Sequence, residues 1–443
     1  MSYPPLRIGV IGTGVSGLSA AWLLAKRHRV TLFEREGRPG GHCNTITVDA
    51  PEGPRNVDTG FIVYNTQSYP NLMAWFDHLG VDCARTSMSF AVSLSDARVE
   101  YSSNAPFGLL GAKRNLFRAS HWRMLRDVSR FFRTARQDLA DQSLGNISLG
   151  DYLTQRGFGR GFVDHHILPM ACAIWSTPEE HVLDFPAAAF IRFFANHGLL
   201  QAFNRPEWRT VDGGSRIYVD KVLSDFRGEL RLGTPISRVT RTEEGVQVDD
   251  GQGGRHQFDH VVIAAHADDA LAMLADADAE ERRLLGAFQY ADNTAVLHTD
   301  RAMMPRRRRL WASWNYISAK GQGAQRLCVS YWMNSLQPLQ TKRDYFVTLN
   351  PIDEIAETNR IATIAYKHPM FNSAAMAAQP ELWSLQGRRR TWFCGSYFGY
   401  GFHEDGLQSG LAVAEQLGDV RRPWRLDNPS DRLSLPREDE QVA

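Results

Sequence analysis

The hydrophobic pattern of the chain begins with a short strand-like run and then changes period. Residues 8–11 are continuously apolar, which is typical of a strand buried on both faces of a parallel sheet. A glycine-rich turn follows, and residues 18–26 then show the spacing of a helix. A second apolar run over residues 30–33 ends at Glu34. The order strand, turn, helix, strand predicts a βαβ unit at the start of the chain.

Three glycines occupy the first turn with the spacing G-x-G-x-x-G: Gly12, Gly14 and Gly17. The first permits the tight turn, the second lets a pyrophosphate approach the backbone, and the third lets the helix pack closely on the strand. The free N–H groups of the helix start favour phosphate charge. Glu34 lies near the offset of ~20 residues at which a carboxylate binds ribose hydroxyls, and its charge disfavours the 2′-phosphate of NADP. The predicted dinucleotide site also includes Ser16 and Arg35.

The next part of the chain changes from strands to helices. After a helix over residues 69–79, alternating residues predict strands over 89–94 and 99–101. Residues 119–139 have a helical pattern, and residues 162–200 are dense in aromatic and aliphatic side chains with few charges. We expect the latter to form helices in the wall of a large apolar cavity. The apolar positions of the helix over 119–139 are Trp122, Leu125, Val128 and Phe132.

The pattern then returns to that of the first unit. A helix is predicted over residues 216–223, a hairpin over 246–258, and a buried strand over 258–265 that closes the first sheet. Helices over 269–285 lead to further strands, at 294–298, 327–332 and 346–349. Aromatic residues alternate with polar neighbours in this region, and we expect them to line the cavity with one face of a second sheet: Trp311, Trp314, Tyr316, Tyr331 and Trp332.

Composition places the chain among ordinary globular proteins. Its 443 residues suggest two or three domains, and 43% are hydrophobic and 22% charged. No run approaches the ~20 apolar residues of a membrane-spanning helix, and the early first strand leaves no room for a signal peptide. A cytoplasmic location is therefore expected. The five cysteines are scattered, and His165, His166, His181 and His197 have no carboxylate or cysteine support, so no metal site is predicted.

Charge is balanced overall but uneven locally. A net charge of +1 argues against a nucleic-acid-binding protein. Four consecutive arginines stand at residues 306–309, and a longer basic stretch is opposed only by Asp127. That stretch is either a solvated helix face or a surface resting on anionic lipid, where each Lys or Arg contributes ~1 kcal/mol. Its basic residues are Lys113, Arg114, Arg118, Arg123, Arg126, Arg130, Arg133 and Arg136.

A second glycine pair follows Glu34 in the segment Arg38-Pro39-Gly40-Gly41. Together with the first fingerprint, it resembles the FAD-binding opening of the flavin amine oxidase, protoporphyrinogen oxidase and phytoene desaturase superfamily. The resemblance implies FAD as cofactor, with Gly40, Gly41 and His42 along the pyrophosphate and ribityl chain. It also implies that the segment of Asp58, Thr59 and Gly60 lies beside the isoalloxazine ring, and that the strand containing Ile236 meets the adenine.

The segment over residues 391–411 resembles the closing motif of the same superfamily, which faces the flavin pyrimidine. The implied cofactor residues are Gly395, Glu404, Asp405, Gly406 and Ser409. Tyr397, Tyr400 and His403 lie on this turn, and we predict that they form the catalytic wall. His403 either moves a proton near neutral pH or makes a structural hydrogen bond.

The resemblance implies an α/β fold with a Rossmann-type FAD-binding domain interleaved with an α+β substrate domain. We expect the former over residues 1–85, 205–268 and 386–420, and the latter over 86–204 and 269–385. The polar tail over 421–443 is expected to be loosely ordered.

The whole chain is similar to bacterial FAD-binding proteins encoded beside cyclopropane-fatty-acyl-phospholipid synthases. This implies a hydrophobic or lipid substrate and a lipid-modifying synthase as partner, without naming the bond that is oxidised. The aromatic cavity and the basic helix motivate our first hypothesis, which is oxidation or desaturation of an acyl chain, and the basic stretch from Lys113 to Arg136 favours a peripheral place on the membrane. Two other functions stay open: an amine or porphyrinogen oxidase, and a flavin-binding accessory protein without turnover. His42 and Cys43 stand where amine oxidases carry arginine, which argues against amine oxidation.

Overall fold

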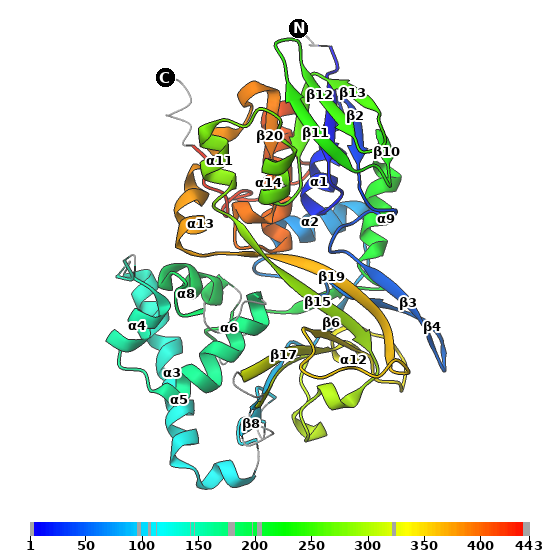
Figure 1. Ribbon diagram of the computed structural model, residues 1–443. Coiled ribbons are helices and arrows are strands. Elements are labelled where there is room, and N and C mark those ends of the chain that lie inside the picture. The colour runs from blue at the N-terminus through cyan, green and yellow to red at the C-terminus, as the bar shows by residue number, and fades with distance from the viewer. Residues whose placement is uncertain are drawn as a thin grey trace.

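The predicted βαβ unit opens a five-stranded sheet in the upper half of the molecule (Figure 1). In the computed structural model, all neighbouring strands of this sheet are parallel, in the order β10-β2-β1-β14-β20. The strands are β1 (Arg7–Ile11), β2 (Arg29–Phe33), β10 (Glu229–Arg231), β14 (His260–Ile263) and β20 (Thr391–Phe393). We call it the Rossmann sheet. The structure describes residues 4–94, 99–104, 108–111, 113–141, 143–145, 147–175, 182–196, 198–201, 206–320 and 325–436.

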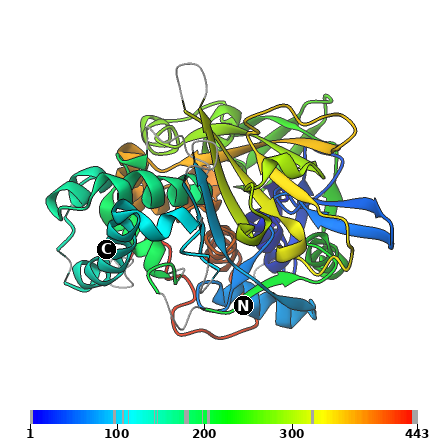
Figure 2. The same ribbon diagram turned by 90° about the horizontal axis from the view of Figure 1, so that it is seen from below.

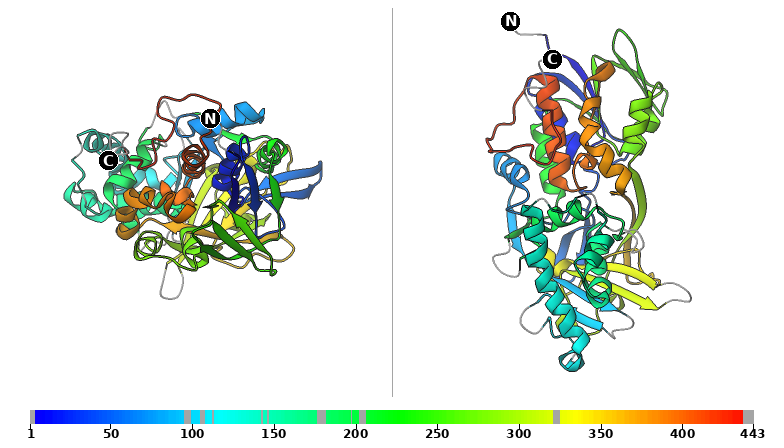
Figure 3. Two further views of the ribbon diagram at one scale, coloured as in Figure 1. Left: turned by 90° about the horizontal axis from the view of Figure 1, so that it is seen from above. Right: turned by 90° about the vertical axis from the view of Figure 1, so that its left-hand side faces the viewer.

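Helix α1 (Val15–Leu24) packs on the Rossmann sheet, and α9 (Arg216–Asp225) and α14 (His403–Gly418) pack on α1. All ten residues of α1 are buried, because α14 packs along it on one side and the sheet on the other (Figure 3, left). A hairpin sheet lies at the edge of this region. It is antiparallel and consists of β11 (Ile236–Arg241), β12 (Val246–Asp250) and β13 (Arg255–Phe258).

A seven-stranded sheet forms the core of the lower half, in the order β19-β15-β18-β17-β16-β7-β8. Its pairs are antiparallel except β16 with β7. The long strands β15 and β19 connect it to the upper half (Figure 1). The bounds are β7 (Phe90–Leu94), β8 (Val99–Ser102), β15 (Gln289–His298), β16 (Trp314–Lys320), β17 (Gln325–Trp332), β18 (Phe346–Leu349) and β19 (Arg360–Met370).

A group of helices lies beside the seven-stranded sheet, as the view from below shows (Figure 2). We call it the helical lobe. Its elements are η1 (Lys113–Phe117), α3 (Ala119–Ala140), α4 (Leu149–Gln155), α5 (Arg160–Phe162), η2 (Val163–Ile167), α6 (Leu168–Trp175) and α8 (Ala187–Asn196). Among the residues that the structure describes, no helix has both the length and the apolar character needed to cross a membrane.

Shorter elements complete the fold. Two small sheets pair β3 (Thr45–Ala50) with β4 (Gly53–Asp58), and β9 (Trp208–Val211) with both β5 (Tyr64–Asn65) and β6 (Cys83–Thr86). The remaining helices are α2 (Pro70–Leu79), α10 (Ala267–Met273), α11 (Ala279–Leu285), η3 (Arg301–Met303), η4 (Arg308–Leu310), α12 (Met333–Leu336), α13 (Ser373–Ala378), η5 (Gln379–Leu385), η6 (Arg388–Arg390) and η7 (Ser396–Phe398).

The C-terminal tail differs from its expected loose order as far as residue 436. Arg422 is 8% exposed and donates to Glu415 and to the Asn71 side chain. Trp424 stacks on Trp22 of α1 at a ring-centroid distance of 6.1 Å. The polar composition of the tail suggested loose order, but Arg422 and Trp424 have partners on α1, α2 and α14. Residues 437–443 lie outside the described part of the chain.

Candidate active site

One cavity of about 1560 Å³ extends from the glycine turn after β1 to the helical lobe. Sites for a single small molecule usually enclose ~300–1,000 Å³. The cavity therefore has room for a dinucleotide and a second molecule. Its position at the carboxyl ends of parallel strands is where open α/β sheets bind ligands.

The first glycine turn is shaped by close backbone contacts on one side and open space on the other. Gly12 has a φ of +104°, and a Cβ there would lie 2.6 Å from the carbonyl oxygen of Ala264. A Cβ on Gly17 would lie 1.9 Å from the carbonyl oxygen of Gly12. A Cβ on Gly14 would meet no atom within 4 Å. Gly14 thus leaves space for a ligand, while the other two hold the turn against the sheet.

The start of α1 offers free hydrogen-bond donors to this space. Gly14 is its N-cap, no side chain caps it, and its first turn has no acidic residue. The first N–H groups of such a helix lack internal partners and carry the positive end of the helix dipole. Ser16 also lines the cavity. This end of the cavity therefore suits the phosphates of a dinucleotide.

The second glycine pair faces the first turn. Gly40 and Gly41 have φ angles of +108° and +55°, and a Cβ on Gly41 would lie 3.2 Å from the Cα of Gly14. The Gly40 N–H donates to the Thr13 hydroxyl oxygen at 3.1 Å. Both glycines and His42 line the cavity, so two motifs separated in sequence form one cradle.

Glu34 is held at the edge of this cradle. It is 9% exposed, and its Oε2 accepts from the Thr13 N–H at 3.1 Å and from the Thr13 hydroxyl. Its Oε1 accepts from the Glu36 N–H at 3.0 Å. Arg35 and Ile236 also line the cavity. A fixed carboxylate beside the dinucleotide turn suits ribose hydroxyls and repels a 2′-phosphate.

Asp58 supports the cavity from outside, contrary to its predicted cofactor contact. It is fully buried, and its carboxylate accepts from the Ser215 N–H at 2.9 Å, from the Thr45 hydroxyl at 2.6 Å and from Gln337 Nε2 at 2.8 Å. Burial raises the pKa of Asp58 to about 6. Its neighbours Thr59 and Gly60 do line the cavity. Asp58 therefore joins β4 to the start of α9 and leaves the contact surface to Thr59 and Gly60.

At the start of α14, the side chains of Glu404 and Asp405 also bind other parts of the protein and do not line the cavity. Glu404 accepts from the N–H groups of Asn71 and Leu72 at 2.9 and 3.0 Å, so it binds the start of α2. Asp405 accepts from the Tyr400 N–H at 2.9 Å and from Arg432 Nη1 at 2.8 Å. Both side chains have no exposed surface, which corrects the prediction that they touch the cofactor.

Two further predicted cofactor residues, Gly406 and Ser409, are packing positions outside the cavity wall, and Gly17 has the packing role that its place in the first glycine motif predicted. Ser409 is fully buried and accepts from the Gly395 N–H at 3.0 Å. A Cβ on Gly406 would lie 2.8 Å from a methyl carbon of Val15, which shows how closely α14 approaches α1. The α14 motif therefore fixes the turn after β20, whose Gly395, Tyr397, Tyr400 and His403 do line the cavity.

His403 is half-buried and belongs to a hydrogen-bonded cluster with the buried side chains of Cys43 and Tyr218. Its Nε2 lies 3.0 Å from Cys43 Sγ and 3.1 Å from the Tyr218 hydroxyl, and the last two atoms are 2.6 Å apart. The imidazole stacks on Phe61 at 3.7 Å. Burial lowers the pKa of His403 to about 3 and raises the pKa of the Cys43 thiol. His403 is thus neutral at pH 7, and the structural hydrogen bond is the alternative that the geometry favours.

Two more histidines stand beside His42 in the cavity wall. His42 stacks on Tyr366 at 4.8 Å, with the His368 and His266 rings at 5.5 and 6.4 Å. Burial and the neighbouring His368 lower the pKa of His42, and burial lowers the pKa of His368 to about 4. At neutral pH this part of the wall carries no histidine charge.

Four residues that line this cavity each have a buried polar atom with no hydrogen-bond partner in the described part of the chain. One is His166 Nε2 in the helical lobe, and the other three are His42 Nε2, His266 Nδ1 and the Tyr397 hydroxyl. Buried polar groups are nearly always paired in native proteins. A bound polar molecule would supply the missing partners, so the unpaired atoms of His42, His266 and Tyr397 support a cofactor between the cradle and the turn after β20.

His368 and Tyr366 were not predicted as site residues because β19, the strand that carries them, was not predicted from the sequence. This strand runs along the sheet edge, and charged residues such as Arg360 and Lys367 interrupt its apolar positions. The alternation of Ile364, Tyr366 and His368 is the signal that would have found it.

Side chains of the helical lobe close the other end of the cavity. None of the described lining residues between 101 and 199 is acidic or basic except His166, and burial lowers the pKa of His166 to about 4. Helix α3 contributes its half-buried stripe to this wall. The larger apolar and aromatic side chains of this end are Tyr101, Leu109, Leu125, Val128, Phe132, Met170, Phe193 and Leu199. We call it the apolar chamber.

The aromatic residues of the second sheet contribute less to the wall than expected. Trp314 and Tyr331 line the cavity. Trp311 packs against Trp332 and Phe346 in a separate cluster, and Tyr316 is 1% exposed in the main core. Neighbouring residues on a strand point to opposite faces, and the sequence pattern did not show which face met the cavity.

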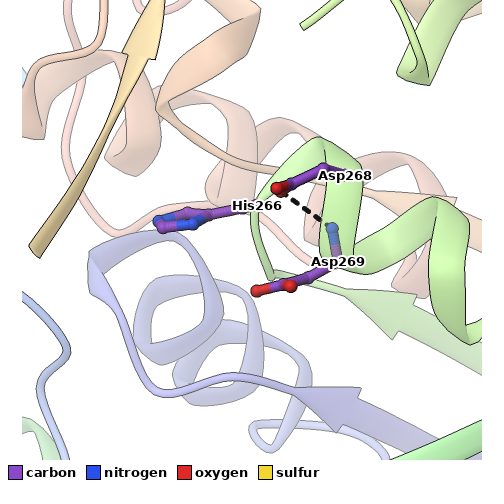
Figure 4. Close-up of side chains that lie close together, drawn as sticks. All are labelled: His266, Asp268 and Asp269. Atoms are coloured by element: carbon purple, nitrogen blue, oxygen red, sulfur yellow. Dashed lines mark hydrogen bonds between the residues drawn. The ribbon is translucent and has the colours of Figure 1, made fainter. Parts of the chain in front are cut away.

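His266, Asp268 and Asp269 gather at the start of α10, with one ligand atom from each lying within 4.8 Å of the others (Figure 4). Asp268 Oδ1 accepts from the Asp269 N–H at 2.8 Å. Arg35 lies 3.5 Å from Asp269, and Lys367 lies 4.0 Å from Asp268. These cations already balance the carboxylates, so we assign no metal to the cluster. His181 and His197 lie outside the described residues.

The facing glycine turns at the carboxyl ends of the parallel sheet define a dinucleotide-binding protein. A family model described as flavin containing amine oxidoreductase matches residues 15–336, and the chain belongs to this family. FAD is the cofactor of the family.

Comparisons with individual proteins show the extent of the likeness. A fatty acid isomerase from P. acnes that produces CLA is 15% identical, with a TM-score of 0.66 over 95% of this chain and 99% of its own. Wild-type putrescine oxidase bound to putrescine is 13% identical, with a TM-score of 0.67 over 94% and 99%. At these identities the likeness shows the fold alone. A protein of Acanthamoeba polyphaga mimivirus described as uncharacterized is 46% identical over 63 residues, which is 14% of this chain and 12% of that protein.

Proposed function

We propose that this FAD-dependent oxidoreductase acts on a long fatty acyl chain, free or carried by a phospholipid, and oxidises or desaturates it. The observation that carries the proposal is the apolar chamber, which continues from the dinucleotide cradle in one cavity. An acyl chain needs a long uncharged wall, whereas a cationic amine gains from a buried carboxylate or an aromatic cage.

The lining residues would have different roles at the two ends of the cavity. Phe132, Phe193 and Leu199 would contact the acyl chain and exclude water, and Tyr397, Tyr400 and His403 would face its reacting carbons. Desaturation removes a hydride from one carbon and a proton from its neighbour. FAD, when bound, would supply the hydride acceptor. A separate oxidant such as dioxygen would then take the electron pair together with two protons, one of them from the neighbouring carbon, and leave as hydrogen peroxide. Helix α14 begins at His403, so its positive end favours negative charge developing at this wall.

The two other functions are oxidation of an amine or a porphyrinogen, and lipid binding without turnover. Among the described residues, the apolar chamber has no carboxylate that could pair with a cationic amine such as putrescine, and Asp292 in the cavity wall from β15 is exposed to solvent. An accessory protein without turnover would bind a lipid and leave the flavin oxidised. Association with a lipid-modifying synthase stays a prediction.

Anaerobic mixing separates these possibilities. The purified holoenzyme is mixed in turn with oleate, a saturated fatty acid, a phospholipid in detergent, putrescine and a porphyrinogen, and the flavin absorbance is followed. We expect bleaching with an acyl substrate and a mass change of two hydrogens in its chain. Bleaching only by putrescine or the porphyrinogen would overturn the proposal, and a bound but unchanged lipid would support the accessory function.

A further inference from the structure

The apolar side chains most exposed to solvent gather at one end of the molecule. Of the seven large exposed apolar side chains in the described part of the chain, four lie within residues 109–122. Phe117 is 90% exposed, and Leu109, Leu116 and Trp122 are 40–48% exposed. We call these four the apolar tip. Element η1 and the start of α3 carry most of it to the lower end of the molecule, away from the Rossmann sheet (Figure 3, right).

Buried polar contacts hold the apolar tip in this shape. Asn115 is 2% exposed and donates from Nδ2 to the Glu100 carbonyl oxygen at 3.1 Å. His121 is 6% exposed, and its Nε2 lies 2.8 Å from the Leu109 carbonyl oxygen. The Trp122 indole N–H donates to the Leu116 carbonyl oxygen at 3.0 Å. Polar groups therefore point inward and apolar side chains outward, the reverse of an ordinary surface loop.

The charge around the apolar tip has one sign. Residues 109–126 contain five Lys or Arg and no Asp or Glu. Arg123 and Arg126 are exposed, and neither forms an ion pair with any residue that the structure describes. Asp127, the next acidic residue, is 6% exposed and lies 3.3 Å from Arg130. Exposed aromatic side chains ringed by cations are complementary to an anionic lipid surface.

The cavity comes to the surface beside this tip. Leu109 is both an exposed tip residue and part of the cavity wall. Ser129 is exposed and lines the cavity, and Leu125 lines it three residues after Trp122. The surface that would touch lipid and the opening of the apolar chamber are therefore adjacent.

We infer that the apolar tip inserts into an anionic phospholipid surface and brings the chamber opening against its acyl chains. The route of the chain into the cavity rests on the proposed function, but the membrane contact needs no turnover. The sequence pointed to the arginine face of α3 as the contact. The structure points to the tip as the inserted part, with the arginines around it.

Vesicle flotation tests this inference on the full-length holoenzyme. The vesicles are phosphatidylcholine alone or phosphatidylcholine mixed with phosphatidylglycerol. We expect binding to the mixed vesicles, a loss of at least ~tenfold in the L116S/F117S variant, and a loss of roughly fivefold per arginine in R123Q/R126Q. The matched controls are Ile361→Ser, at a similarly exposed apolar residue on β19, and Arg255→Gln on β13, and both should bind as the wild type does.

Three results would overturn the inference. In the first, the wild-type protein does not bind the mixed vesicles. In the second, the L116S/F117S variant floats as well as the wild type. In the third, the wild type is a dimer in solution and L116S/F117S is a monomer, so the apolar tip is a contact between two copies of the chain. Turnover of a water-soluble fatty acid without vesicles tests the proposed function separately, and L116S/F117S should keep it. Vesicle binding without any turnover would support the tip and overturn the proposed function.

Discussion

The two ends of the cavity are built in different ways. The cradle is made of backbone, and Gly12, Gly14 and Gly41 bring main-chain atoms against the space for a pyrophosphate. The apolar chamber is made of side chains from β8, α3, η2, α6 and α8. A backbone site recognises what every member of a cofactor class shares, whereas a side-chain site is set residue by residue. The comparison explains why the cofactor is easier to identify than the substrate.

The largest effect is expected from a glycine substitution in the cradle. A Cβ at Gly17 would lie 1.9 Å from the Gly12 carbonyl oxygen, so G17A must displace the turn itself. We expect loss of about 3 kcal/mol of stability or more, with purified protein lacking flavin absorbance. Thermal unfolding and the visible spectrum of the purified protein measure both.

The matched variant is G14A, because a Cβ at Gly14 meets no protein atom within 4 Å. We expect the apoprotein to unfold at the wild-type temperature while its affinity for added FAD falls. A G14A protein that binds FAD like the wild type would show that no ligand occupies the space beside Gly14.

The same difference decides how much the sequence could predict. The cradle residues Gly12, Gly40 and Gly41 were predictable because glycine adopts positive φ angles without steric cost and has no Cβ to meet the neighbouring backbone. Asp58 and Glu404 were predicted as cofactor contacts, yet both turn away and bind other backbone segments. A motif shows that a residue type is required at a position, but it does not show whether a ligand or a neighbouring element requires it.

The chamber was predictable only in outline. The apolar stretch over residues 162–200 indicated a cavity wall. The helix pattern of α3, however, did not show which of its side chains face the core, which face the cavity and which face solvent. His121, Met124 and Phe131 enter the core, and Leu125, Val128 and Phe132 meet the cavity. Neighbouring apolar stripes on one helix differ by tertiary contacts, which a single sequence does not contain.

The second largest effect is expected from filling the chamber. Val128 lines the cavity from α3, and a larger side chain there would shorten the space for an acyl chain. We expect V128F to lower kcat/KM at least ~tenfold for oleate and little for octanoate, with unchanged flavin content. The control is A140F, at an exposed position on the same helix. Equal losses for both substrates would contradict a chamber that holds the distal chain.

Acid tests the solvent exclusion at His368, which lines the cavity beside His42. The folded pKa of His368 is about 4, below its ordinary value of 6.5, so the unfolded chain binds more protons between these values. The stability that His368 contributes is therefore complete above pH 6.5 and falls as the pH drops toward 4. The slope is about 1.4 kcal/mol per pH unit.

Urea unfolding of the wild type and H368N at several pH values checks this sign. We expect the H368N curve to be flatter below pH 6.5 and parallel to the wild type above pH 7. Parallel curves at every pH would show that solvent reaches His368 in the folded protein.

The smallest effect is expected at Cys43, which joins the cradle to the turn after β20. Its Sγ contacts Tyr218 and His403, and a serine hydroxyl can make the same two hydrogen bonds. We expect C43S to change stability by no more than about 1 kcal/mol and to keep its flavin.

The Cys43 thiol and the Cys394 thiol are both buried outside the cavity wall, and burial raises both pKa values. A thiolate is the form that attacks a flavin, so acid precipitation should release the flavin from both the wild type and C43S. Flavin retained in the wild-type pellet but released from C43S would show a covalent bond at Cys43, and the side chains of this junction would then bind the cofactor as directly as the cradle backbone does.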